Sequence, residues 1–266
     1  MKHITGGGWL RKCHAADPRT SGALVRQRDR RRAQNLSLFD RLKSPPEWAR
    51  SLLWLLPDRI LGREWFRLPT SKEVVALTFD AGGTDAGLDE ILRTLESKGV
   101  PATFFITGKW AEVYPDQAQR IASRFPVGNH TFSHPDVTKL SDSAIEEQLV
   151  EGRRALITVT GHAPRHLFRF PFGASNEHAI RVVNSLGYRC IRWTVGSRGW
   201  IGHSAGVTTD EIVQAILERL RPGAIILMHV GGSRDDGSTL DADALPAVID
   251  GIRSRGYSFV TIERFV

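Results

Sequence analysis

The sequence predicts an α/β fold, a distorted (β/α) barrel of about seven units that is TIM-barrel-like. From residue 73 onward, short apolar runs rich in β-branched and aromatic residues alternate with segments whose apolar residues recur at helical spacing. A strand, a helix and a second strand in succession form a right-handed crossover, which gives a parallel sheet covered by helices. The body of roughly 190 residues is slightly short for the usual eight units.

The expected strands are short and mostly apolar, and the first of them reads EVVALTF. Such runs, apolar on both faces, are typical of buried strands in a parallel sheet. The strands are expected at residues 73–79, 102–107, 166–170, 188–195, 224–229 and 257–262.

The expected helices lie between these strands and carry apolar residues at three- and four-residue spacing. Two of them begin with a capping box, in which a hydroxyl and an acid three residues later satisfy each other's backbone N–H groups. These boxes are Ser143 to Glu146 and Thr208 to Glu211. The helices are expected at residues 87–99, 143–161, 176–187, 208–223 and 244–256.

Charge and cysteine content exclude two classes of protein. Residues 1–72 carry 16 Lys and Arg against 6 Asp and Glu, whereas residues 73–266 carry 20 against 23. The net charge of +7 therefore comes from a basic N-terminal extension, and the folded domain is not a basic nucleic-acid-binding body. Two cysteines in unlike segments, Cys13 and Cys190, form neither a disulfide framework nor a zinc–cysteine site.

The extension is expected to be partly disordered, with a helical segment near residues 44–66. Trp48, Leu52 and Leu55 would share one side of this helix, which we expect to pack on the main domain, with contact to a membrane surface as the alternative. The first residues lack the apolar core of a signal peptide. The most apolar run, 51–57, is far shorter than the roughly 20 residues that span a bilayer.

Reactive side chains follow several of the expected strands. Asp80 ends the first strand before a glycine-rich loop, and Arg169 and His229 end two later strands. In a barrel of parallel strands these ends meet at one edge, where such folds place their chemistry. His130 and His134 have the four-residue spacing of a metal-ligand pair. Taken singly, each residue also has a structural interpretation. Asp80 could cap a turn, and Arg169 could stack on its aromatic neighbours. The histidines could be solvated or hydrogen-bonded within the fold.

Their order along the chain is more specific. The segments TFDAG, HTFSH, RFPFG, a tryptophan loop and LMH occur in this order between about residues 74 and 262. This series resembles the polysaccharide deacetylase family, also called the NodB-homology domain or carbohydrate esterase family four. The resemblance implies a distorted barrel and the metal-dependent removal of acetyl groups from a polysaccharide.

The resemblance also implies roles for the residues that match the motifs. Asp80 matches the general base, Arg169 the arginine that keeps this base ionised, and His229 the general acid that protonates the departing amine. His130 and His134 match the two metal-binding histidines.

Three further positions match substrate contacts of the family. The backbone N–H of Phe172 matches a donor to the oxyanion, and Trp200 and Leu227 match the walls of the acetyl pocket. The metal is expected to be zinc, with cobalt or nickel as alternatives, because imidazole suits all three.

Two positions depart from the family pattern. Ala81 stands where the family usually has a second aspartate that binds the metal, so a weakened metal site is expected. Asp80 or Asp85 could supply the missing ligand. Gly199 stands where the family often has an aspartate, and we expect Arg169 to lose an anchor there.

The function expected from these residues is N-deacetylation of an N-acetylated polysaccharide, with peptidoglycan ahead of chitin-like oligosaccharides. The alternatives are a catalytically impaired glycan-binding module, which Ala81 and Gly199 favour, and a small-amide hydrolase on the same barrel. The resemblance implies a polysaccharide partner and a location outside the cytoplasm or in the cell envelope. We expect a monomer, and the charge distribution predicts no specific nucleic-acid partner. Since no signal peptide is seen, a cytoplasmic location is the alternative, and the basic extension could contact a membrane surface or the cell wall.

Overall fold

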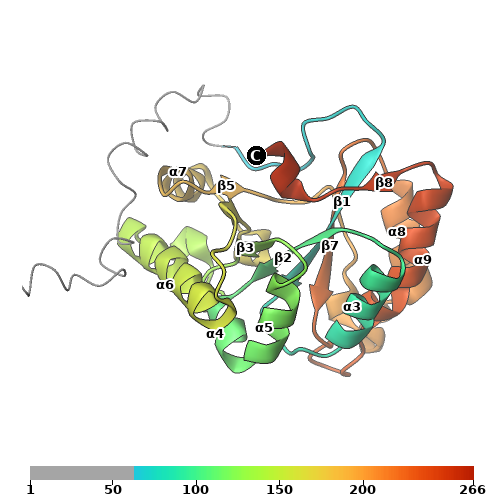
Figure 1. The fold of residues 1–266 in the computed structure, drawn as a ribbon, viewed down its shortest axis with the longest axis horizontal. Coiled ribbons are helices and arrows are strands. Elements are labelled where there is room, and N and C mark those ends of the chain that lie inside the picture. Colours follow the sequence, from blue (N-terminus) through green and yellow to red (C-terminus); the bar gives the residue numbers. More distant parts are fainter. Residues whose placement is uncertain (1–62) are drawn as a thin grey trace, which may run out of the picture. The chain divides into compact units, whose positions relative to one another are not determined.

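The computed structural model describes residues 63–266 and confirms the predicted α/β barrel-like fold. Seven parallel strands form a curled sheet in the order β5-β4-β3-β2-β1-β7-β6, and an eighth, β8, pairs with the start of β1 (Figure 1). The strands are β1 (Val74–Ala81), β2 (Ala102–Ile106), β3 (Val127–Asn129), β4 (Leu167–Phe168), β5 (Arg189–Cys190), β6 (Val195–Gly196), β7 (Ile225–Val230) and β8 (Ser258–Phe259).

Strand β1 lies in the middle of the sheet because nearly all of its residues are apolar and buried. On one face, Val75, Leu77, Phe79 and Ala81 enter the main core between the sheet and the helices. The opposite face carries Thr78 and Asp80, whose oxygens both bond to the same guanidinium. Alternation along a strand separates these two faces, so β1 serves both the core and a polar centre.

The helices pack around the sheet in two groups (Figure 1). On one side α9 contacts both α3 and α8, and α4, α5, α6 and α7 form a second series. The helices are α3 (Leu88–Ser97), α4 (Gly108–Val113), α5 (Pro115–Ala122), α6 (Asp142–Thr160), α7 (Glu177–Ser185), α8 (Thr209–Glu218) and α9 (Leu240–Ser254).

One of the two predicted capping boxes is wrong. α6 is capped by Ser141, whose hydroxyl accepts a hydrogen bond from the backbone N–H of Ala144, and Ser143 lies inside the helix. Ser141 has the extended backbone that an N-cap requires, whereas a residue already in the helix cannot cap it. The box from Thr208 to Glu211 is confirmed in both of its hydrogen bonds.

Other differences concern short elements. The sequence did not predict α4, α5 or β3, and β3 contains Gly128 and Asn129, which are uncommon in strands. The single strand expected at 188–195 is two strands, β5 and β6, because the chain leaves the sheet between them. α9 begins at Leu240 rather than at 244 and contains Pro246 in its second turn.

The predicted segment near 44–66 lies mostly outside the described residues, as does the rest of the extension up to residue 62. At its described end the chain is not helical: Trp65 forms a parallel bridge with Ile191, and Arg67 an antiparallel bridge with Ala224. These bridges tie the segment to the ends of two strands. Among the helices from residue 63 onward, none is long and apolar enough to cross a membrane.

Candidate active site

The carboxyl edge of the sheet collects most of the predicted site residues. Asp80 is the next-to-last residue of β1, and His229 is the next-to-last residue of β7. His130 follows β3 directly, and Arg169 follows β4 directly. Because these strands are parallel and adjacent in the sheet, residues distant in the sequence meet at one edge.

Asp80 and Arg169 form a buried ion pair. Arg169 Nη1 donates to Asp80 Oδ1 at 2.7 Å. Burial alone would raise the pKa of Asp80, but the nearby Arg169 guanidinium, together with His130 and His229, holds this pKa below its usual value. The Asp80 carboxyl is therefore an ionised base inside the protein.

Besides Asp80, the Arg169 side chain has hydrogen-bond partners and an aromatic contact that do not involve residue 199. Its Nη1 also donates to the Thr78 hydroxyl at 2.9 Å, and its Nη2 to the carbonyl oxygen of Arg192 at 3.2 Å. Its guanidinium stacks 4.1 Å from the centre of the Phe105 ring. The expectation that Gly199 removes an anchor of Arg169 is wrong, because a Cβ at position 199 would meet the Asp241 carboxylate instead.

His130 has a defined tautomer. Its Nδ1 lies 2.8 Å from the carbonyl oxygen of Arg169, which can only accept, so Nδ1 carries the hydrogen. Burial lowers the pKa of His130, which keeps the ring neutral. The lone pair of Nε2 then faces Asp80 Oδ2 at 3.6 Å, an arrangement that attracts a cation or a proton between the two atoms.

His134 lies beside His130 on a loop whose backbone is strained. The two imidazole rings are 4.9 Å apart between centroids, and His134 has a positive φ of 62°. The loop is fixed by the Asn129 amide oxygen, which accepts from Thr131 N–H, and by the Gln148 amide oxygen. Burial, followed by the nearby His130, lowers the pKa of His134 to about 4. Both imidazoles are therefore neutral lone-pair donors near neutral pH.

The three predicted substrate contacts surround this centre. The Phe172 side chain is 70% exposed, and its ring lies 4.5 Å from that of His134. The Trp200 side chain is 58% exposed, with its ring 6.5 Å from that of His229. Leu227 is buried on β7 and pairs in register with Thr78 of β1. Two exposed aromatic rings thus flank the histidines from the loops after β4 and β6.

The donor atoms for a metal ion are present only in part. Two neutral imidazoles and a carboxylate are the donor types that zinc prefers. Ala81 adds no donor, because an alanine side chain has none, and its methyl group is buried in the main core. Asp85 Oδ2 accepts a hydrogen bond from Gln117 Nε2 at 2.9 Å. Within residues 63–266, no group of three or more His, Cys, Asp or Glu side chains is placed to hold a metal ion.

Sequence reasoning missed several residues that support the site. Thr78 is hidden in an apolar run, and Asn129 ends a three-residue strand. Asp241 lies just before the helix expected at 244–256, and the structure places it in the first turn of α9. Its carboxylate lies within hydrogen-bond distance of His229. None of these three residues stands at the end of a predicted strand, and the matched motifs gave none of them a role.

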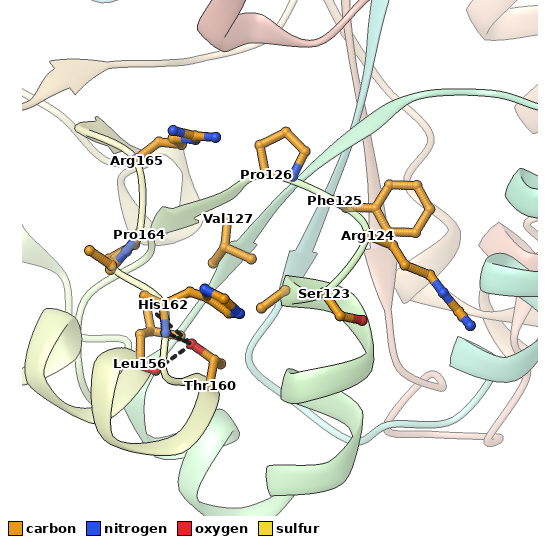
Figure 2. Close-up of a pocket in the computed structure, with 12 residues that line it drawn as sticks. Ser123, Arg124, Phe125, Pro126, Val127, Leu156, Thr160, His162, Pro164 and Arg165 are labelled. Carbon is orange, nitrogen blue, oxygen red and sulfur yellow. Dashed lines mark hydrogen bonds between the residues drawn. The ribbon is translucent and has the colours of Figure 1, made fainter.

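A cavity of about 390 Å³ lies apart from this centre (Figure 2). Its lining comes from residues 122–127, which lead into β3, and from Leu156, Thr160 and residues 162–165, which precede β4. These are the amino ends of the strands, whereas the predicted site residues follow the carboxyl ends. The cavity therefore belongs to the opposite edge of the sheet and contains none of the predicted site residues.

The fold and the site define this chain as a (β/α)-barrel protein with a buried Asp80–Arg169 ion pair and neighbouring histidines at the carboxyl edge of its sheet. The family model for polysaccharide deacetylase matches residues 67–191. The chain is 33% identical over 199 residues to a peptidoglycan-N-acetylglucosamine deacetylase of Bacillus cereus, covering 74% of this chain and 70% of that protein. It is 33% identical to a chitooligosaccharide deacetylase of Sinorhizobium fredii, covering 72% of this chain and 91% of that protein. The chain belongs to the polysaccharide deacetylase family.

A solved structure adds a contrasting relative. The wild-type BA3943 protein of Bacillus anthracis, described as a pseudoenzyme of carbohydrate esterase family four, matches with a TM-score of 0.69 and 26% identity. The match covers 78% of this chain and 70% of that one. The same barrel is thus found in relatives described as deacetylases and in one described as a pseudoenzyme.

Proposed function

We propose that the protein is a hydrolase that removes N-acetyl groups from an N-acetylated polysaccharide, with peptidoglycan ahead of chitin-like oligosaccharides. The observation that carries this proposal is the pairing of Asp80 with His229 in register on adjacent strands, with Arg169 keeping Asp80 ionised. A base and an acid on neighbouring strands suit the hydrolysis of an amide, which needs one proton removed and one delivered.

The two residues divide these proton transfers. Asp80 takes a proton from the attacking water as the bond from water oxygen to the acetyl carbon forms. His229 gives a proton to the sugar nitrogen as the carbon–nitrogen bond breaks, so the products are acetate and a free amine. The backbone N–H of Phe172 is the proposed donor to the oxyanion. Phe172 has a positive φ of 59°, and such strained backbone clusters at functional sites.

A divalent metal ion, zinc before cobalt or nickel, would be held by His130 and His134, with Asp80 as the carboxylate nearest to them. Asp85 is the second choice, since its carboxylate is already bonded to Gln117. A bound ion would supply Lewis acidity toward the acetyl oxygen and water. The small number of protein ligands predicts weak binding, so the metal should be removed easily by a chelator.

The substrate class rests on the relatives and on the shape of the site. One relative is named for peptidoglycan and another for chitooligosaccharide. The exposed rings of Phe172 and Trp200 offer flat apolar surfaces on both sides of the histidines, which suits a sugar chain lying across the edge of the barrel. We place the protein in the cell envelope as a monomer, with the basic extension of residues 1–72 against the membrane surface or cell wall.

The proposal is tested by acetate release from N-acetylglucosamine oligomers and from peptidoglycan. Protein stripped with a chelator is assayed with and without added zinc or cobalt. Metal-dependent acetate from either glycan supports the proposal, and the better of the two substrates decides between peptidoglycan and chitin-like chains. A folded protein that releases no acetate with any metal contradicts it.

A glycan-binding module without turnover is the second candidate, because no complete metal-ligand set is formed among the described residues and one structural relative is described as a pseudoenzyme. Isothermal titration with chitin oligomers separates the two. Binding with no acetate after long incubation with metal favours the module, and turnover excludes it.

A further inference from the structure

Asp241 lies directly behind His229 and is almost fully enclosed. It belongs to the first turn of α9, and its exposed fraction is 3%. Asp241 Oδ2 accepts the backbone N–H of His229 at 2.8 Å and lies 3.3 Å from Nδ1 of the same residue. One carboxylate oxygen therefore contacts both the backbone and the ring of His229.

This contact fixes which ring nitrogen carries the hydrogen. Asp241 Oδ2 already accepts the backbone N–H of His229, so it acts as an acceptor toward the ring as well, and Nδ1 of His229 is the donor. Nε2 then carries the exchangeable proton: a ring protonated on both nitrogens donates from Nε2 and returns to the neutral form with hydrogen on Nδ1.

We propose that Asp241 is a positioning residue for His229, holding its ring and tautomer so that Nε2 delivers the proton to the departing nitrogen. This inference rests on the proposed function. It assigns a role to a residue of α9 that none of the matched motifs contains.

The second carboxylate oxygen argues against a purely structural role. Asp241 Oδ1 is buried and has no hydrogen-bond partner among the described residues. Burying an unsatisfied carboxylate oxygen lowers stability. The capping function expected of an acid in this turn can be served by Asp243, which is exposed and lies in the same turn. The stability of α9 therefore does not account for a buried carboxylate at position 241.

Gly199 explains how the carboxylate fits. A Cβ at position 199 would lie 2.4 Å from Asp241 Oδ1 and 2.7 Å from its Cγ, which is closer than real Cβ contacts. A side chain at 199 and the carboxylate at 241 therefore compete for one space. The absence of a side chain at 199 and the buried acid at 241 form a matched pair on two separate elements.

The matched pair can be exchanged experimentally. Asp241→Ala and Asp241→Asn are each expected to lower kcat about 100-fold with little change in KM, because proton transfer is impaired while substrate contacts remain. Gly199→Asp alone should also have a lower kcat than the wild type, because the new side chain overlaps that of Asp241. The double variant Gly199→Asp/Asp241→Ala should recover about tenfold over Asp241→Ala, because a carboxylate again enters the shared space. Asp243→Ala is the control in the same turn and should keep wild-type kcat.

Wild-type kcat in folded Asp241→Ala and Asp241→Asn would overturn the proposal, and so would a double variant no better than Asp241→Ala. Thermal unfolding of each variant shows whether a loss of kcat reflects a loss of fold. If Asp241→Ala does not fold, the kcat of the isosteric Asp241→Asn variant tests the proposal: a lowered kcat supports it, and a wild-type kcat overturns it.

A measurement independent of turnover separates this inference from the proposed function. In chelated protein with ¹⁵N-labelled histidine, the ring-nitrogen shifts of His229, assigned by their loss in His229→Gln, report its tautomer. We expect hydrogen on Nδ1 in the wild type and a mixture of tautomers in Asp241→Asn. A neutral ring with hydrogen on Nε2 and none on Nδ1 in the wild type, or the same tautomer in both proteins, would overturn the inference. A fixed Nδ1–H in a protein that releases no acetate would support the positioning by Asp241 and contradict the proposed function.

Discussion

Arg169 Nη1 and Asp80 Oδ1 are 2.7 Å apart in a part of the barrel that solvent barely reaches. An isolated carboxylate in such a place would take up a proton, because burial disfavours the charged form. The guanidinium reverses this effect and keeps the pKa of Asp80 below its usual value. The base of the proposed reaction is therefore held ionised by a fixed charge rather than by water.

Replacing Arg169 with Met should expose this dependence. Breaking a buried ion pair from one side destabilises a protein by about 3–5 kcal/mol, which urea unfolding would measure. With the guanidinium gone, burial dominates and the pKa of Asp80 rises, so the acid limb of the activity profile should move to higher pH. Arg181→Met is the control, because Arg181 is exposed and its pair with Glu177 is 3.4 Å long. An unchanged acid limb in a folded Arg169→Met protein would show that Arg169 does not tune Asp80.

Matched substitutions distinguish the two carboxylates that could be metal ligands, Asp80 of β1 and Asp85 of the loop that follows it. Asp80→Asn should abolish acetate release while far-ultraviolet circular dichroism stays native-like, since Asn keeps the shape but cannot take the proton. Asp85→Asn should change kcat by no more than about threefold, because Asp85 loses only part of its bond to Gln117. An active Asp80→Asn enzyme would remove Asp80 as the base. A loss of zinc affinity in Asp85→Asn, measured by titration, would make Asp85 a ligand.

How much of this site the sequence predicts depends on the kind of contact. Asp80, Arg169 and His229 were predictable because each ends an apolar run, and parallel strands bring such ends together. Asp241 was not, because it lies outside the helix expected at 244–256 and its contacts with His229 and Gly199 arise from tertiary packing. Strand β3 was not predicted for a similar reason. Two of its three residues, Gly128 and Asn129, have low strand propensity, and the pairing of β3 with β2 depends on the tertiary structure.

The low pKa of His134 predicts a pH-dependent stability in chelated protein. A buried histidine with a folded pKa of about 4 binds fewer protons than the unfolded chain, whose histidine has a pKa near 6.5. The free energy of unfolding should therefore fall as pH drops from about 6.5 to 4, by at most about 1.4 kcal/mol per pH unit and by less for a partly exposed ring. Urea unfolding at several pH values measures this slope. His134→Asn, which tolerates the positive φ, should show a shallower slope, and equal slopes would contradict the assignment.

Trp200 should act on substrate binding more than on chemistry. Its ring is mostly exposed, so Trp200→Ala should change the free energy of unfolding by less than about 0.5 kcal/mol. Loss of the ring surface should raise KM for chitin oligomers about tenfold, while kcat changes less. Phe66→Ala removes another exposed aromatic ring and should leave KM unchanged. An unaltered KM in Trp200→Ala would exclude the ring as a wall of the site.

Helix α6 supports the histidine loop through Gly152. A Cβ at this position would lie 2.8 Å from the carbonyl oxygen of Thr131 and 2.9 Å from Asn129 Oδ1. These are the backbone and the amide that hold the loop between His130 and His134, so Gly152→Ala must push the loop away from the helix. We expect a loss of about 1–3 kcal/mol in stability, as for other overpacked sites, and weaker zinc binding by calorimetric titration. Gly83→Ala is the control, because a Cβ there meets nothing within 4 Å. Zinc affinity equal to that of the wild type in Gly152→Ala would show that the two histidines do not depend on this contact for their metal-binding geometry.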